Sequence, residues 1–186
     1  MRKLATAVVL AALVAGVIAS VAYAEPKSLL GKVLGAWSKK PGKILGIRRD
    51  MNNVLTIVML RGDEVRAYEN APRKKQVTRE PALEYDLEKL KALPGGDAGW
   101  AHKKAVESDV LAESFHVIRC VRLVEREDGS MAWNVYLYSY TGNFRGAVVV
   151  DAKTWEVAPE IVGPENVTNP NEETWLKEEE EEESEE

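Results

Sequence analysis

Few side chains in this sequence have the types and spacings that acid–base, nucleophilic or metal chemistry requires. The two histidines, His102 and His116, lie far apart along the chain, and neither belongs to a His-Glu-x-x-His or Cys-x-x-Cys setting. Glu107 and Asp109 are adjacent-but-one on a predicted helix, so their carboxylates point apart. The sequence has no nucleophile elbow, phosphate-binding glycine loop or dinucleotide fingerprint. We therefore expect a protein that is not an enzyme, with no catalytic residue, metal or cofactor.

Tyrosines supply a better candidate for binding. Alternation along residues 131–140 places Trp133, Val135 and Leu137 on one face of a predicted strand. The opposite face carries Tyr136, Tyr138 and Tyr140, which we predict as the binding residues, because tyrosine joins apolar area to a polar tip and is enriched at interfaces. The alternative is that these rings pack against the other half of the chain or form ordinary cross-strand pairs.

The elements that must position these residues fall into two halves of similar order. The first half begins with a short helix that Ser28 can cap, followed by a hairpin with asparagines at its turn and a third strand. After a basic connection at 73–79, Thr78 and Pro81 suit the start of another helix with an apolar stripe. Pro94-Gly95-Gly96 then breaks the chain. The predicted ranges are 28–37 for the first helix, and 43–49, 54–61 and 64–68 for the strands.

The second half repeats this order from residue 100 onward. A helical wheel over 100–115 gathers apolar side chains on one face, and three strands follow at 117–125, 131–140 and 144–151. Three antiparallel strands can bury one face beneath one amphipathic helix. We predict an α+β fold in which a helix packs on a three-stranded antiparallel sheet, occurring twice as tandem αβββ lobes. Cys120, the single cysteine, is expected to be a small buried hydrophobe.

The second half resembles a PepSY domain over about residues 100–158. The resemblance rests on a helix ending before His116, a turn at Asp128-Gly129, and the phrase Val148-Val149-Val150-Asp151-Ala152-Lys153-Thr154-Trp155-Glu156-Val157. It implies an extracytoplasmic module found in protease propeptides and envelope proteins, which binds peptide or restrains peptidases and has no catalytic residues. Trp155 stands where the family usually has glycine, so we expect the final turn to differ in shape here.

The two ends of the chain predict export and an acidic tail. Arg2 and Lys3 precede an apolar stretch at 4–22 that closes on Ala22-Tyr23-Ala24, which is the layout of a signal peptide. The stretch is also nearly long enough to be a retained anchor. Residues 172–186 hold ten glutamates and one lysine, whereas residues 25–171 carry 22 basic and 20 acidic side chains. This near-neutral charge of residues 25–171 does not indicate electrostatic binding of nucleic acid.

These signals divide the chain into four parts: a signal peptide at 1–24, an α+β lobe at 25–95, a PepSY-like lobe at 96–158, and a loose linker with a disordered acidic tail at 159–186. The linker contains Asn166-Val167-Thr168, which fits the glycosylation acceptor pattern. We expect a secreted, periplasmic or cell-surface protein that contacts the membrane only if the leader is kept as an anchor.

Two classes of function remain open at this point. The first is an exported, non-catalytic interaction module that binds a protein or peptide in the envelope or exterior and, in one version, restrains a peptidase. The second is an envelope carrier or sensor of lipid-like ligands, with both strand sets joined in one curved sheet around an apolar cavity. A packed two-lobed body favours the first class, and a continuous sheet around an apolar pocket favours the second.

Overall fold

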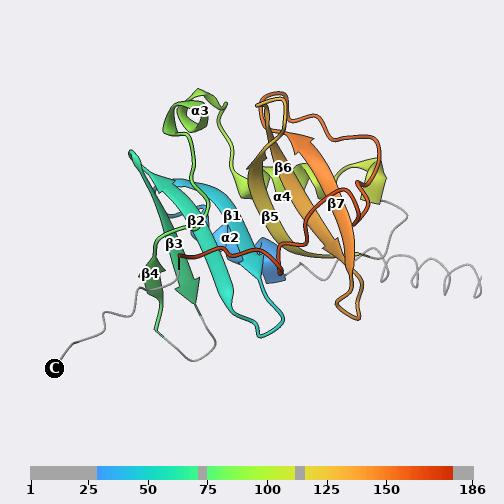
Figure 1. Ribbon diagram of the computed structural model, residues 1–186, viewed down its shortest axis with the longest axis horizontal. Coiled ribbons are helices and arrows are strands. Elements are labelled where there is room, and N and C mark those ends of the chain that lie inside the picture. Colours follow the sequence, from blue (N-terminus) through green and yellow to red (C-terminus); the bar gives the residue numbers. More distant parts are fainter. Residues whose placement is uncertain (1–28, 71–74, 112–115, 178–186) are drawn as a thin grey trace, which may run out of the picture.

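The computed structural model describes residues 29–70, 75–111 and 116–177 and shows an α+β fold with one antiparallel sheet of seven strands. The spatial order of the strands is β4-β3-β2-β1-β5-β6-β7, so the strands predicted in the two halves join edge to edge (Figure 1). The sheet strands are β1 (Lys43–Arg49), β2 (Leu55–Arg61), β3 (Glu64–Asn70), β4 (Val77–Arg79), β5 (Val117–Glu125), β6 (Met131–Tyr138) and β7 (Phe144–Asp151).

The helices within the described residues are short. They are α2 (Leu29–Trp37), α3 (Leu87–Ala92), α4 (Ala98–Val106) and a 3-10 turn, η1 (Asp109–Leu111). None of them is both long and apolar enough to cross a membrane. The leader at 1–24, the cap at Ser28, residues 112–115 of the expected second-half helix and the glutamates after Lys177 lie outside the described residues.

Two differences from the expected elements have local causes. The helix expected to start near Thr78 starts at Leu87, because the side chain of Asp86 accepts hydrogen bonds from the backbone N–H groups of Glu88 and Lys89 and so caps the helix there. Thr78 lies instead in β4, opposite Tyr68 of β3. An edge strand has replaced the first predicted helical turn.

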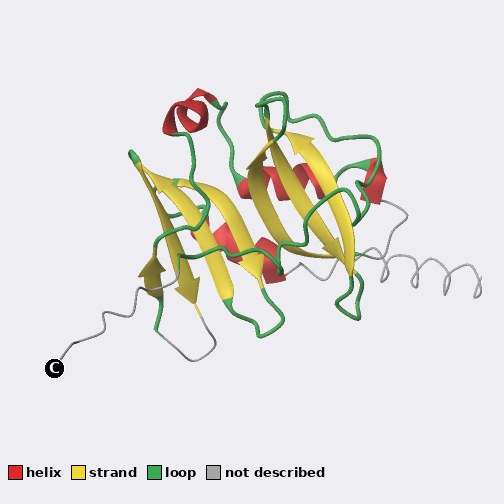
Figure 2. Ribbon diagram, viewed as in Figure 1, coloured by secondary structure: helices red, strands yellow, loops and turns green. Residues whose placement is uncertain are grey.

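The sheet has one apolar face and one polar face. Helix α4 packs against β1, β5, β6 and β7 on the apolar face, where Trp133, Val135 and Leu137 are completely buried. Helix α2 contacts α4 and β5 and therefore lies on the same side of the sheet (Figure 2). On the other face the cross-strand registers align Gly46 with Arg122 and Arg122 with Asn134. The buried polar residues among the described ones are Thr56, Arg122 and Asn134.

The polar face is covered by a strap, defined here as residues 162–177. Val162 pairs with Ala147 at the β7 edge of the sheet, and Leu176 pairs with Pro81 just beyond β4 at the opposite edge. The strap therefore crosses the whole sheet on the side away from the helices (Figure 2). Residues 162–177, which were expected to belong to a loose linker and the start of a disordered tail, thus lie against the sheet, whereas the rest of the expected tail, at 178–186, lies outside the described residues. Trp175, which is 3% exposed, supplies the apolar burial that the glutamate-rich composition concealed.

Trp155, in the turn after β7, has a φ of 64°, which lies in the left-handed region that usually favours glycine. Tryptophan therefore adopts here the positive φ that it was expected to avoid. Its ring lies between two other tryptophans, with its centroid 6.1 Å from that of Trp100 and 6.2 Å from that of Trp133. A β-carbon on Gly96 would come within 2.5 Å of the Trp155 ring. Aromatic packing against the core thus offsets a backbone conformation that costs a non-glycine residue about 1–2 kcal/mol.

This strained position gives a stability prediction. We expect Trp155→Gly to be more stable than Trp155→Ala by about 1 kcal/mol, because both variants lose the ring but only alanine keeps the cost of a positive φ. The matched pair is Trp100→Gly and Trp100→Ala within α4, where glycine should be the worse residue by about 1 kcal/mol. Chemical denaturation of the four variants measures both differences. The same order of stability of the glycine and alanine variants at both positions would contradict backbone strain at Trp155.

Candidate functional site

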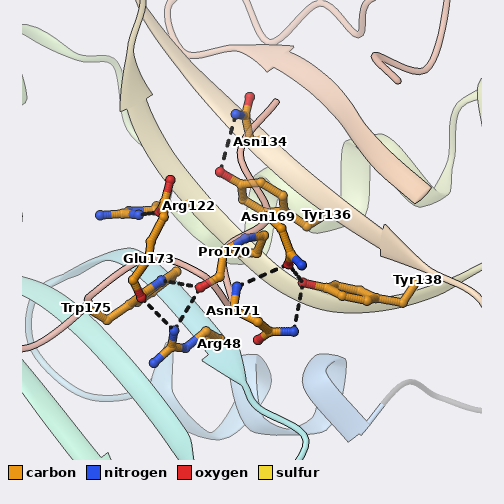
Figure 3. A network of polar contacts seen from close by, with 10 residues as sticks. All are labelled: Arg48, Arg122, Asn134, Tyr136, Tyr138, Asn169, Pro170, Asn171, Glu173 and Trp175. Carbon is orange, nitrogen blue, oxygen red and sulfur yellow. Dashed lines mark hydrogen bonds and ion pairs between the residues drawn. The ribbon is translucent and has the colours of Figure 1, made fainter. Parts of the chain in front are cut away.

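The strap is attached to the polar face through one tryptophan held between two arginines (Figure 3). The Trp175 ring centroid lies 4.9 Å from the guanidinium carbon of Arg48 and 4.7 Å from that of Arg122. Beneath the ring lies Gly46, where an added β-carbon would stand 3.2 Å from Trp175 Cζ3. A strand residue without a side chain, flanked by two cations, therefore forms a receptacle for one aromatic ring.

Hydrogen bonds fix the strap backbone above this receptacle. Arg48 Nη1 donates to the carbonyl oxygen of Pro170 at 2.8 Å and to that of Glu173 at 3.2 Å. Trp175 Nε1 donates to the same Pro170 carbonyl at 3.1 Å. The Glu173 carboxylate forms an ion pair with Arg122, which is 6% exposed. Desolvation lowers the pKa of Arg48, but arginine remains a cation at any physiological pH.

The predicted tyrosines do not form one open surface. Tyr136 and Tyr138 are 2% and 1% exposed beneath the strap, whereas Tyr140 is 68% exposed beyond the end of β6. The Tyr138 hydroxyl donates to Asn169 Oδ1 at 3.1 Å and accepts from Asn171 Nδ2 at 3.3 Å. Burial raises the pKa of both buried tyrosines above the usual value. Their contact with a partner stays a prediction. Within this chain Tyr138 binds the strap, and Tyr136 contacts Asn134 and Phe144.

The other residues singled out from the sequence lie away from this network. Asn166 is exposed within the strap, and its amide donates to Glu165 Oε1. Cys120 is fully buried, and desolvation raises the pKa of its thiol well above the usual value. Burial lowers the pKa of His102 and, together with the charge of Arg145, that of His116. The described residues contain no group of three or more histidine, cysteine, aspartate or glutamate side chains able to hold a metal ion.

A cavity of about 600 Å³ opens beside the strap. It is bounded by the loop 82–86, by the end of β5 at 122–125, and by Glu173 and Thr174 of the strap. Both the strap network and this cavity, called here the seam cleft, lie where β1 meets β5. The sequence reasoning missed Arg48, Arg122, Glu173 and Trp175. A signal for them existed, since two arginines interrupt apolar strands and a lone tryptophan stands among glutamates.

Comparisons with known proteins leave the family open. No protein-family model and no curated protein matches the chain. A search of solved structures finds a crystal structure described as a "putative lipoprotein" from Clostridium difficile 630. It is 14% identical, with a TM-score of 0.33, and the alignment covers 69% of this chain and 86% of that one. At that score the likeness carries no argument about fold or function.

The anchoring of the strap predicts a strong effect of truncation. Removing residues 172–186 should lower the free energy of unfolding by about 3 kcal/mol or more, because Trp175 is lost from a buried position and Arg122 loses its carboxylate partner. Removing residues 178–186 is the matched control and should change stability by less than about 0.5 kcal/mol, since that segment contains only glutamate and serine. Urea denaturation compares the two. Equal stability of both truncated proteins would mean that the strap does not hold the sheet.

Proposed function

We propose that this chain is an exported, non-catalytic module that binds an extended segment of a protein or peptide on the sheet face opposite its helices. The observation that carries the proposal is the strap. A segment without regular helix or strand structure lies across that face, and arginine side chains bind its backbone carbonyls at Pro170 and Glu173. Peptide-binding domains hold extended ligands in the same way, with main-chain hydrogen bonds and a few side-chain anchors.

The buried polar residues of this face support the proposal. A sheet face that served only as a core would be apolar, as the helix-covered face is. Here the buried Arg122 and Asn134 lie side by side, and the amide of Asn134 donates to the Tyr136 hydroxyl at 3.4 Å. Such a face can bind polar backbone. The resemblance of residues 100–158 to a PepSY domain supports two further parts of the proposal. These are that the partner is a protein or peptide and that binding restrains a peptidase.

Two further elements of the proposal concern organisation and location. We propose that the chain consists of two tandem αβββ units, because α2 precedes β1, β2 and β3 in the same order in which α4 precedes β5, β6 and β7. The β1–β5 pairing then joins the units. The signal-peptide layout of residues 1–24 supports placement in the envelope or outside the cell.

The carrier of lipid-like ligands is the second candidate, favoured by the single continuous sheet. A lipid carrier requires an apolar chamber of ligand size. The seam cleft has a suitable volume, but Arg122, Glu173, Lys89 and Glu125 line it, and these charges suit a polar ligand better than an acyl chain. The interaction module therefore stands first.

Photocrosslinking in the producing cell tests the proposed function. A photoreactive residue at Leu83, which is 38% exposed beside the seam cleft, should yield adducts with protein or peptide that mass spectrometry maps to one extended segment. The same residue at Lys103, exposed on α4, is the matched control and should not give these adducts. Adducts of lipid mass at Leu83 would favour the carrier instead. Partner adducts found only from Lys103 would contradict binding on the strap side.

A further inference from the structure

The seam cleft lies beside the end of β5, beyond the point where its ladder with β1 stops. The register of β1 against β2 shifts between Ile44 and Gly46, which marks a β-bulge or similar irregularity. A bulge bends its strand and increases the local twist. The ladder between β1 and β5 accordingly contains three residue pairs and stops at Gly46 and Arg122. The last residues of β5, at 123–125, continue to pair with β6 but have no ladder partner on the β1 side.

The free edge of β5 faces a cavity with defined walls. The loop 82–86 forms the opposite wall, and the strap contributes Glu173 and Thr174 at one end. Leu83 and Met131 supply apolar surface. Because Glu173 is held by Arg122, the strap is a fixed wall of this cleft and need not be displaced for a ligand to enter.

The charges around the cleft are unbalanced toward acid. Of the four carboxylates that line it, Glu125 pairs with Lys89 and Glu173 pairs with Arg122. The remaining two, Glu84 and Asp86, are exposed on the loop, and neither forms an ion pair with any residue that the structure describes. An approaching cation therefore meets two carboxylates without an ion-pair partner beside apolar surface, of which Asp86 also caps α3.

Apolar surface beside these carboxylates defines the rest of the ligand. Leu83, which is 38% exposed, and Met131 line the cleft together with Glu84 and Asp86. A long aliphatic stem can cover such surface while its charged end stays at the carboxylates. The ligand should therefore combine a cation with an aliphatic stem.

We propose that the seam cleft binds an extended partner segment through one lysine or arginine side chain. This inference rests on the proposed function and names its ligand chemistry. The aliphatic stem of the basic residue lies on Leu83 and Met131, and its charge meets Glu84 and Asp86. The backbone of the segment runs along the end of β5 at Val124 and Glu125, which has no ladder partner on the β1 side.

Amide chemical-shift mapping tests this proposal on the protein comprising residues 25–186. Three acetylated hexapeptides that differ only in a central Arg, Gln or Glu are titrated into the ¹⁵N-labelled protein. The Arg peptide should shift the amides of 83–86 and 123–125 in a saturable way, and more strongly than the other two. Replacing Glu84→Gln together with Asp86→Asn should weaken this binding by about fivefold or more, since each exposed charge pair contributes a few tenths to about 1 kcal/mol. Asparagine keeps the helix cap.

Matched variants and outcomes make the test decisive. Glu107→Gln together with Glu160→Gln removes the same charge away from the cleft and should leave the affinity unchanged. Equal shifts with the Glu peptide would overturn the choice of a basic side chain. Shifts confined to amides elsewhere on the polar face would overturn the assignment of the cleft as the binding site, while leaving the proposed function in place. Absence of any shift at millimolar peptide would also overturn the cleft proposal, and photocrosslinking then decides the proposed function separately.

Discussion

The contact of Trp175 with Gly46, Arg48 and Arg122 lies across the line where the two halves of the sheet join. Strands β1 and β5 share three residue pairs, whereas β2 and β3 share seven. The ring of Trp175 lies over this short ladder and touches both strands at once, through Arg48 on β1 and Arg122 on β5. The strap therefore contributes across the seam the burial and hydrogen bonds that the short ladder lacks.

The same contact explains the chemistry of the uncovered part of the face. Two arginines in buried strands need acceptors, and the strap supplies the carbonyls of Pro170 and Glu173 to Arg48 and the Glu173 carboxylate to Arg122. Beyond Arg122 the ladder between β1 and β5 stops, and the end of β5 lines the seam cleft, where Glu84 and Asp86 have no ion-pair partner among the described residues. Strap and cleft are thus parts of one polar surface. The chain's own strap occupies one part of this surface, and the cleft is the part that a ligand can enter.

The sequence predicts the local elements well and the long-range contacts poorly. Strands 117–125 and 144–151 are found with the predicted limits, because alternation and turn residues are local signals. The joining of β1 to β5 has no local signal, since either strand could have remained an edge. The strap was missed because it is rich in proline, asparagine and glutamate, although one buried tryptophan outweighs several solvated polar residues. Trp155 was misjudged because packing, which offsets its backbone strain, depends on tryptophans distant in sequence.

Native-state hydrogen exchange tests most directly whether the strap couples the two sides of the seam. In the wild-type protein the slowest amides of β2 and β6 should exchange with one common opening free energy. In Trp175→Ala the opening free energies of β2 and β6 should differ by about 1 kcal/mol or more. Leu137→Ala, which removes a buried side chain within one half, should lower both opening free energies equally. Equal opening free energies of β2 and β6 in Trp175→Ala would contradict the account, because the short β1–β5 ladder would then suffice to unite the sheet.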